Sequence, residues 1–380
     1  MNKLFSKKTI IVLLVLLILG LVYLLNCNNI SEHFSGYYRC ERRPLGGIYK
    51  EIFKEENVDL NNDLESCGLY YPCGYNGVEK ELRNLDFGQK NNTNRDIFGI
   101  CGSDVIASKS SLWKVVSEYY GRKRASKLIP ESFLLKENRE LPIFKEKFDP
   151  RKVYILKKNI QRKKGIKLTS DYNEVAEANK KKYVMVQEKK ESIIINKRRM
   201  NLRIYIFVQC KNGVKNVFIH EKAKCLYTSK DVIDPVNSNG EEFETLITNS
   251  YVTDLEIYNK NPLTLERLLD YLEKNNGVSG KELKRKIYKN ITEVFQSLLP
   301  KVCNCANLKG NNMYQMFGAD ILIDKGYNVY MLEVNKGPDM KHKDQADHDL
   351  KKRVVFDTFE KMGVVKPKTS EYKNGYTQVI

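Results

Sequence analysis

Residues Phe317–Pro338 read Phe-Gly-Ala-Asp-Ile-Leu-Ile-Asp-Lys-Gly-Tyr-Asn-Val-Tyr-Met-Leu-Glu-Val-Asn-Lys-Gly-Pro. Two apolar runs flank a short Lys-Gly-Tyr-Asn segment, a pattern typical of a β-hairpin. With that segment as the loop, Asp324 pairs with Val329. Counting back along both strands then places Asp320 opposite Glu333. The stretch is therefore predicted to bring two carboxylates face to face.

Strand alternation gives this hairpin two different faces. One face carries the polar side chains together with two apolar ones: Asp320, Leu322, Met331, Glu333 and Asn335. The other face is apolar: Ala319, Ile321, Ile323, Leu332 and Val334. Carboxylate oxygens combined with substrate phosphates are the ligands that Mg²⁺ accepts. The hairpin is predicted to hold a metal, and the alternative is a hairpin whose acids simply face solvent.

Composition sets the outer bounds of the protein. A chain of 380 residues with 42% hydrophobic and 10% aromatic residues can bury a sizeable core, as one large domain or two smaller ones, which excludes a disordered protein. The 65 Lys and Arg against 47 Asp and Glu give a net charge of +18, which favours anionic partners. Because Lys and Asn are frequent throughout, the charge carries little weight by itself.

A basic loop between two strands is the first of three patterns that favour a nucleotide. Val153 to Lys157 is a short apolar strand that ends in a lysine, and a Lys- and Arg-containing loop then leads to Gly165. Lys157 could act as a point charge on phosphates, while the loop amides and Gly165 let the backbone approach them. The alternative is a solvated basic turn.

The other two patterns lie at strand ends. Val184 to Glu188 is a buried strand ending in Gln187 and Glu188, where a hinge can offer backbone groups to an adenine edge. Arg203 begins an apolar strand and shares one face with Tyr205 and Phe207. An arginine there needs an anionic partner, such as a γ-phosphate or a carboxylate, and the alternative is an internal ion pair.

Taken in order, these segments resemble the tubulin–tyrosine ligase family of the ATP-grasp superfamily, from about Gly99 to Gly363. The strands with Asp320, Glu333 and Asn335 resemble the family's metal-binding pair. The other matching segments are Lys109 in Ser-Lys-Ser-Ser-Leu-Trp, Ile129–Phe133, the hinge Val186–Glu188, and Leu246–Asn249.

Three departures from the family pattern concern phosphate handling. The family's Lys-Phe-Asp-x-Arg is Arg199-Met-Asn201-Leu-Arg203 here, so an amide replaces the aspartate. The family's downstream arginine corresponds to Lys224, which keeps the charge and loses the bidentate fork. The glycine-rich loop retains only Gly165.

The resemblance implies an α/β ATP-grasp fold with a mainly antiparallel central sheet, and a ligase that uses ATP and Mg²⁺. ATP would convert a carboxylate of an acidic protein acceptor, such as a glutamate-rich tubulin-like tail, to an acyl phosphate that a free amino acid attacks. Tyrosine, glutamate and glycine all serve as donors in the family, and no motif here selects among them. The implied roles are catalysis for Arg203 and Lys224, ATP binding for Lys109, Lys157, Gly165, Gln187, Glu188, Arg199 and Asn201, and metal binding for Asp320, Glu333 and Asn335.

Two rival functions remain open from the sequence. A nucleotide-binding module that has lost catalysis would account for Asn201, Lys224 and the loop with few glycines. A membrane-tethered nucleic-acid binder would account for the net charge, but the sequence contains no aromatic-interleaved basic motif and no zinc module to support it.

An apolar run at the amino end predicts a membrane anchor. Thr9–Leu25 is almost unbroken in its apolar character and long enough to cross a bilayer as a single-pass helix. A cleaved signal peptide, the alternative, has a shorter apolar core and a small-residue cleavage site. The basic residues before the run favour a cytoplasmic amino end, with the body across the membrane. That orientation suits an ATP-using site badly, and Arg39, Arg42 and Arg43 weaken the bias, so the side of the membrane stays open.

The nine cysteines include no pair of CxxC motifs, so no zinc site is expected. Cys40, Cys67 and Cys73 lie close in sequence, and a disulfide among them is expected if that part lies outside the cytosol. Buried free thiols are expected for most of the others.

The expected divisions are a basic tail (1–8), the anchor (9–25), a stalk or small subdomain (26–94), the ligase-like domain (95–363) and a polar tail (364–380). Helices are predicted after Thr264 and after Ser279, and a last helix ends at Gly363. From Lys366 onward the polar tail is expected to be loosely ordered.

Overall fold

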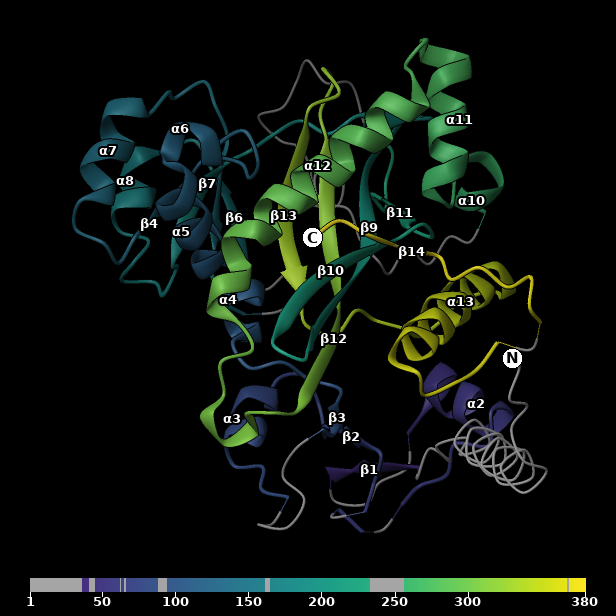
Figure 1. The fold of residues 1–380 in the computed structure, drawn as a ribbon. Coiled ribbons are helices and arrows are strands. Elements are labelled where there is room, and N and C mark those ends of the chain that lie inside the picture. Colours follow the sequence, from purple (N-terminus) through teal and green to yellow (C-terminus); the bar gives the residue numbers. More distant parts are fainter. Residues whose placement is uncertain are drawn as a thin grey trace, which may run out of the picture.

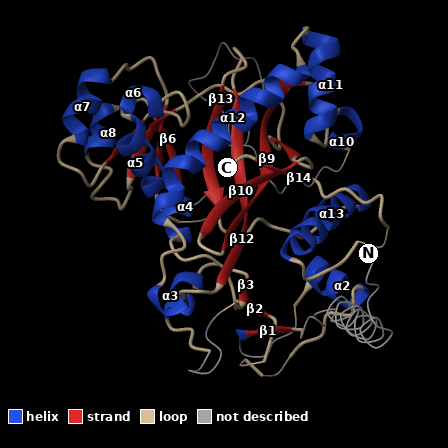
Figure 2. Cartoon of the chain, viewed as in Figure 1, coloured by secondary structure: helices blue, strands red, loops and turns tan. Residues whose placement is uncertain are grey.

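The computed structural model describes residues 36–40, 45–61, 63–64, 66–87, 94–160, 165–232, 256–367 and 369–380. They form an α/β protein with two sheets (Figures 1 and 2). The predicted anchor (9–25) and the segment 246–249 lie outside the described residues. Within the ranges just given, no helix is both long and apolar enough to cross a membrane.

The main sheet is mixed. Its order is β1-β2-β3-β12-β9-β10-β14, with β8 and β11 paired to β9 and β13 paired to β12. The pairs from β12 to β14 are antiparallel, as expected, whereas β1, β2, β3 and the start of β12 pair in parallel, which the sequence did not predict. The strands are β1 (Tyr37–Arg39), β2 (Leu69–Tyr71), β3 (Asp96–Ile97), β8 (Ile194–Ile195), β9 (Arg198–Lys211), β10 (Val214–His220), β11 (Lys224–Tyr227), β12 (Asn312–Ile323), β13 (Val329–Asn335) and β14 (Tyr376–Gln378).

The second sheet has four antiparallel strands in the order β4-β7-β5-β6. Its own small core is largely aromatic, with Phe133, Phe144 and Tyr154 packed together. The strands are β4 (Ser132–Leu134), β5 (Tyr154–Lys157), β6 (Ile166–Thr169) and β7 (Met185–Glu188).

Helices cover both faces of the main sheet (Figure 1). The helices of the described residues are α2 (Gly47–Glu55), α3 (Val78–Arg83), α4 (Ser103–Ala107), α5 (Lys109–Tyr120), α6 (Arg122–Ala125), α7 (Glu140–Lys147), α8 (Tyr172–Ala176), α10 (Ile257–Lys260), α11 (Leu265–Asn276), α12 (Gly280–Leu298) and α13 (Gln345–Met362). The predicted N-caps are confirmed: Thr264 accepts a hydrogen bond from Arg267 N (3.3 Å), and Ser279 accepts one from Glu282 N (3.3 Å).

Strand β9 separates two hydrophobic cores. Its even-numbered residues from Leu202 to Val208 pack with α12, while Tyr205 and Phe207 pack with α13 on the other side. The predicted alternation along this strand is therefore confirmed. Because both faces are covered along Leu202–Val208, the polar residues Arg199 and Asn201 that line the pocket lie before this stretch, near the second sheet.

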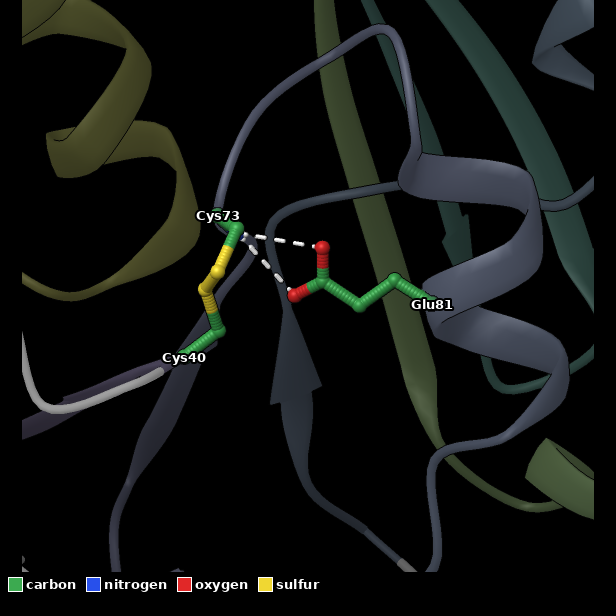
Figure 3. A group of neighbouring side chains, drawn as sticks. All are labelled: Cys40, Cys73 and Glu81. Atoms are coloured by element: carbon green, nitrogen blue, oxygen red, sulfur yellow. Dashed lines mark hydrogen bonds between the residues drawn. A yellow bond between two sulfur atoms is a disulfide. The ribbon is translucent and has the colours of Figure 1, made fainter.

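Residues 36–87 extend the main sheet through β1 and β2. Helix α2 packs on α13, with the rings of Phe53 and Phe359 4.7 Å apart. Cys40, just after β1, is bonded to Cys73, whose backbone amide donates to both oxygens of Glu81 at 3.0 and 3.1 Å (Figure 3). The disulfide expected in this segment is confirmed, with Cys67 as the unpaired member.

The expectation of a loosely ordered tail was wrong. β14 pairs with β10, and the completely buried carboxylate of Asp357 accepts hydrogen bonds from Gly375 N (2.7 Å) and His220 Nε2 (2.9 Å). Asp357 lies in α13, far from His220 in sequence, so the local pattern of the tail gave no sign of this attachment.

The expectation of free thiols was also wrong for four cysteines. Cys101 is bonded to Cys305 and Cys210 to Cys303, with Cα atoms 6.0 and 6.5 Å apart. The partners are 204 and 93 residues apart, so only the folded sheet brings them together. Cys225 remains a buried free thiol, as expected.

Candidate active site

A cavity of about 150 Å³ lies between the two sheets. One part of its wall is apolar and comes from Ile155, Ile166, Leu168, Leu322 and Leu332. The remaining wall is mostly polar and includes seven of the predicted site residues: Lys157, Gln187, Glu188, Arg199, Asn201, Asp320 and Glu333. The fold therefore gathers predicted site residues that are up to 176 positions apart in sequence, from Lys157 to Glu333, around one pocket.

The hairpin of β12 and β13 places Asp320 opposite Glu333, as predicted. Its register nevertheless shifts by one residue beyond that pair, because Leu332 is an extra residue in β13. Ile323, and not Asp324, pairs with Val329, and Asp324 instead accepts hydrogen bonds from the amides of Gly326 (2.9 Å) and Asn328 (2.8 Å) in the turn.

This bulge corrects two assigned faces. Met331 pairs with Ile321 and is completely buried in the core, and not on the acidic face. Leu332 points the other way and lines the pocket with Leu322. An inserted residue reverses the alternation on one side of it, so the same strand supplies a core residue, a pocket wall and a carboxylate.

Asp320 of β12 lies next to Glu333 and Asn335 of the paired strand β13. Arg203, on the neighbouring strand, donates to both oxygens of Asp320 from Nε (2.5 Å) and Nη2 (3.1 Å). The Asn335 amide nitrogen lies 3.4 Å from Glu333 Oε1. Two carboxylates and one amide oxygen form a hard donor set of the kind that Mg²⁺ accepts, so the residues present fit this ion.

The surroundings of Asp320 and Glu333 shift the pKa values of the two carboxyl groups in opposite directions. Burial acts to raise the pKa of Glu333, but Lys109, Lys157 and Arg203 outweigh it and hold that pKa below its ordinary value. For Asp320, burial raises the pKa, the nearby Glu333 carboxylate adds to the rise, and Arg203 offsets it only in part. The nearby cations therefore favour the ionised form of Glu333, whereas burial beside Glu333 disfavours the ionised form of Asp320.

Two lysines from different elements, Lys157 of β5 and Lys109 of α5, lie near Glu333. Lys157 Nζ donates to Gln187 Oε1 (2.6 Å), and burial lowers the pKa of Lys157 to about 8. Lys109 is the first residue of α5, and its Nζ lies 3.5 Å from Glu333 Oε2 and 3.4 Å from the carbonyl oxygen of Ile160. Both ammonium groups can therefore face an anion bound beside the carboxylates.

The Gln187 side chain makes hydrogen bonds to other residues of the protein. Its Nε2 donates to Ser132 Oγ (2.8 Å) and to the carbonyl oxygen of Pro130 (3.3 Å), which orients the oxygen that Lys157 uses. Glu188 pairs with Lys190 (2.8 Å) at the pocket wall. At the end of β7, the amide of Glu188 donates to the carbonyl oxygen of Glu131 (2.9 Å) and that of Lys189 to the carbonyl oxygen of Val153 (3.2 Å), so the hinge interpretation remains a prediction.

On β9, alternation carries Arg199, Asn201 and Arg203 to the same face. Arg199 forms an ion pair with Glu191, a pocket residue that the sequence analysis missed because it lies in an irregular Lys- and Glu-rich loop. Asn201 lies opposite Leu322 and lines the pocket.

Gly165 and Lys224, like Lys109, Arg203 and Asn335, are not among the residues that line the cavity. Gly165 directly precedes the wall residue Ile166, and its carbonyl accepts from Lys158 N (2.7 Å); the loop 161–164 is outside the described residues. Lys224 pairs with Arg203 across β11 and β9, and its Nζ lies 2.7 Å from Asp347 Oδ1. Sequence reasoning missed Asp347, although its i,i+4 spacing with Lys351 in α13 is visible.

The fold and site define an α/β protein whose two sheets enclose an apolar-walled pocket ending in paired carboxylates and several cations. Comparison with known families is consistent with this arrangement, because the model of the Tubulin-tyrosine ligase family matches residues 89–372. The chain belongs to the tubulin–tyrosine ligase family.

Individual relatives are distant. The human tubulin monoglutamylase TTLL4 is 23% identical over 286 residues, covering 71% of this chain and 23% of that protein. Tubulin glycylase 3B of Tetrahymena thermophila is 24% identical over 216 residues, covering 55% of this chain and 18% of that protein. The probable tubulin polyglutamylase TTLL9 of Rattus norvegicus is 20% identical over 176 residues, covering 46% of this chain and 37% of that protein. The chain therefore spans less than half the length of each of these relatives.

Proposed function

We propose that this protein is an ATP-dependent ligase of ATP-grasp fold, which joins a free amino acid to a carboxylate of an acidic protein acceptor. The observation that carries the proposal is the meeting of Asp320 and Glu333 with Lys109, Lys157 and Arg203 at one end of an apolar-walled pocket. Relatives named as glutamylases and glycylases support amino acid ligation as the reaction class.

Different parts of the pocket suit the base and the phosphates of a nucleotide. The apolar wall offers aliphatic side chains from both sheets to a flat ring. The phosphates would then extend toward Lys157 and Lys109. The pairing of Lys157 with Gln187 keeps that ammonium aimed into the pocket before any ligand binds.

Asp320, Glu333 and Asn335 would hold Mg²⁺. When bound there, the ion supplies neutralisation of charge on the transferring phosphate oxygens. Arg203 holds the Asp320 carboxylate in place through its fork, and the cations around Glu333 keep that carboxylate ionised and ready for a metal.

The proposed reaction has two steps. A carboxylate oxygen of the acceptor attacks the γ-phosphorus of ATP, giving an acyl phosphate and ADP. The amine of the donor then attacks the acyl carbon, phosphate leaves, and the amine loses a proton as the amide forms. Arg203 and Lys224 are the proposed cations for the reacting anionic groups, and positioning plus charge neutralisation supply the catalysis without a protein nucleophile.

A second function, nucleotide binding without turnover, is favoured by two observations. Lys224 is already paired with Asp347 at 2.7 Å, and Asn201 stands where the family pattern has an aspartate. A lysine whose charge is neutralised by the protein stabilises developing negative charge less well than a free cation does.

The test is ADP release by the full chain with Mg-ATP, an acidic protein acceptor and each amino acid in turn, with Glu333→Gln as the control. Release that depends on one amino acid and is lost in the control is expected, and it would name the donor. Mg²⁺-dependent nucleotide binding with no amino-acid-dependent release would favour the second function and contradict the first.

A further inference from the structure

Six of the eight cysteines in the described ranges form disulfides. The pairs are Cys40–Cys73, Cys101–Cys305 and Cys210–Cys303, and the unpaired thiols are Cys67 and Cys225. Such a set is typical of proteins that mature in oxidising compartments, because cytosolic reductants keep thiols reduced.

Solvent exposure separates the paired cysteines from the unpaired ones. Cys73 is exposed, and Cys303 and Cys305 are half-buried, yet all three are paired. Cys67 and Cys225 are buried, and burial raises the pKa of both thiols above the ordinary value. An accessible thiol reacts readily in an oxidising environment, whereas a buried thiol with a raised pKa is inert. In the part of the chain that the structure describes, every cysteine with appreciable exposure is thus protected by pairing.

The disulfides Cys101–Cys305 and Cys210–Cys303 are not among the residues that line the pocket. Cys303 and Cys305 fasten one loop to the end of β9 and to the turn before α4, where Cys303 N also donates to the carbonyl oxygen of Cys101 (2.8 Å). Cys210 follows Arg203 by seven residues along β9, roughly 23 Å at ~3.3 Å per residue. These bonds therefore connect distant segments and do not take part in the proposed reaction.

We propose that the catalytic domain forms these three disulfides in an oxidising compartment and modifies an acidic acceptor there, in the secretory lumen or at the cell exterior. Each bond forms by thiol–disulfide exchange: the cysteine pair loses two electrons and two protons to the disulfide of an oxidised dithiol oxidoreductase, which becomes a dithiol. The statement about the acceptor rests on the proposed function, whereas the disulfides and the compartment do not.

An independent sequence feature agrees with this location. The apolar run Thr9–Leu25 follows a lysine-containing amino end, which favours retention of that end in the cytoplasm and transfer of the following domain, although Arg39, Arg42 and Arg43 after the run weaken this bias. An acceptor met after that transfer is not a cytosolic protein. The substrate class would then differ from the tubulin in the names of the relatives.

The first test maps the cysteines in the full chain produced in cultured animal cells. Thiols are alkylated before lysis, and a non-reducing digest is analysed by mass spectrometry. Linked peptides containing Cys40–Cys73, Cys101–Cys305 and Cys210–Cys303 are expected, with alkylation of Cys67 and Cys225 after denaturation. Alkylation of all six paired cysteines in cells would overturn the proposal.

The second test reads the side of the membrane without disturbing a disulfide. Val214→Thr creates an Asn-x-Thr glycosylation acceptor at Asn212, in the exposed turn between β9 and β10, and Val214→Ala is the matched control. The threonine variant should gain one glycosidase-sensitive increment of mass over the alanine variant. Equal masses would overturn the location.

Both readouts are independent of ligase activity. An inactive protein with the expected linked peptides and glycan would contradict the proposed function and support this inference. An active protein with free thiols and no added glycan would do the reverse.

Discussion

In the amino-terminal half of β9, its ionic end, Arg203 holds Asp320 with two hydrogen bonds, whereas near the carboxyl terminus of the strand, its disulfide end, Cys210 is bound covalently to Cys303. Both ends join strands and loops that are distant in sequence. The ionic end can exchange its partners for a metal or a phosphate, because each charge there has only noncovalent neighbours. The disulfide end has no such freedom. One long strand can therefore serve chemistry at one end and stability at the other. Substitutions at the ionic end should change the rate, and those at the disulfide end the stability.

The largest effect should come from the ionic end. Glu333→Gln removes one proposed metal ligand and the charge that faces Lys109. We expect ADP release to fall by on the order of 10²–10³-fold, since the loss of one preorganised group at the developing charge has effects of this size. The matched control is Glu266→Gln, a highly exposed position in α11, which should leave the rate unchanged. Equal rates for both variants would contradict the assignment of the site.

At the disulfide end, stability should change and the rate should not. Cys210→Ser opens the bond to Cys303 and should lower the free energy of unfolding by about 2–4 kcal/mol, a typical value for a native disulfide. A urea titration of the oxidised protein measures this loss, with Cys225→Ser as the control for a change at an unpaired cysteine. A large fall in turnover per folded molecule would show that the two ends are coupled.

A substitution of Arg203 distinguishes the effect of its two hydrogen bonds to Asp320 from the effect of its charge. Arg203→Lys keeps the positive charge but cannot donate to both oxygens of Asp320. We expect kcat/KM to fall by roughly 10- to 100-fold, the value of a hydrogen bond to a charged group. Arg198→Lys is a control on the same strand, since Arg198 pairs with Asp231 away from the carboxylate pair. An unchanged rate in Arg203→Lys would mean that charge alone suffices.

The smallest effect concerns the contact between α13 and α2, remote from both ends of β9. Hydrogen bonds to Glu51 and to Asp349 raise the pKa of His348, which also lies near His342 and Lys352. A raised pKa in the folded state means that this contribution to stability is fully present below the ordinary pKa and is lost as the pH rises through the folded value.

The thermal midpoint should therefore fall slightly between about pH 6 and pH 8, by on the order of 1 °C, because the groups are at the surface. His348→Gln should remove this pH dependence. An identical slope in the variant would assign the titration to another group.

Much of the ionic end could be predicted from the sequence, because it depends on local rules. Period-2 alternation and a hairpin placed Asp320 opposite Glu333, and alternation along β9 placed Arg203 on the face of Tyr205 and Phe207. The bulge at Leu332 was not predictable, since Met331 and Leu332 are both apolar and the pattern does not indicate which one faces the core.

The disulfide end and the tail depend on contacts across the whole fold. Cys101 and Cys305 are 204 residues apart, and Asp357 holds a tail segment against a different strand. The sequence shows that these residues are thiols and a carboxylate, but which partners they bind follows only from the order of the strands in the sheet. The same holds for Asp347, whose pairing with Lys224 needs α13 placed beside β11.

In the proposed reaction, the acceptor carboxylate is phosphorylated at this site. The most direct measurement uses an acidic acceptor peptide whose carboxylates carry oxygen-18, with Mg-ATP and the donor amino acid, followed by mass analysis of the released phosphate. The acyl-phosphate route predicts one oxygen-18 atom in phosphate for each amide bond formed, and none with Glu333→Gln. Unlabelled phosphate accompanying amide formation would contradict the account.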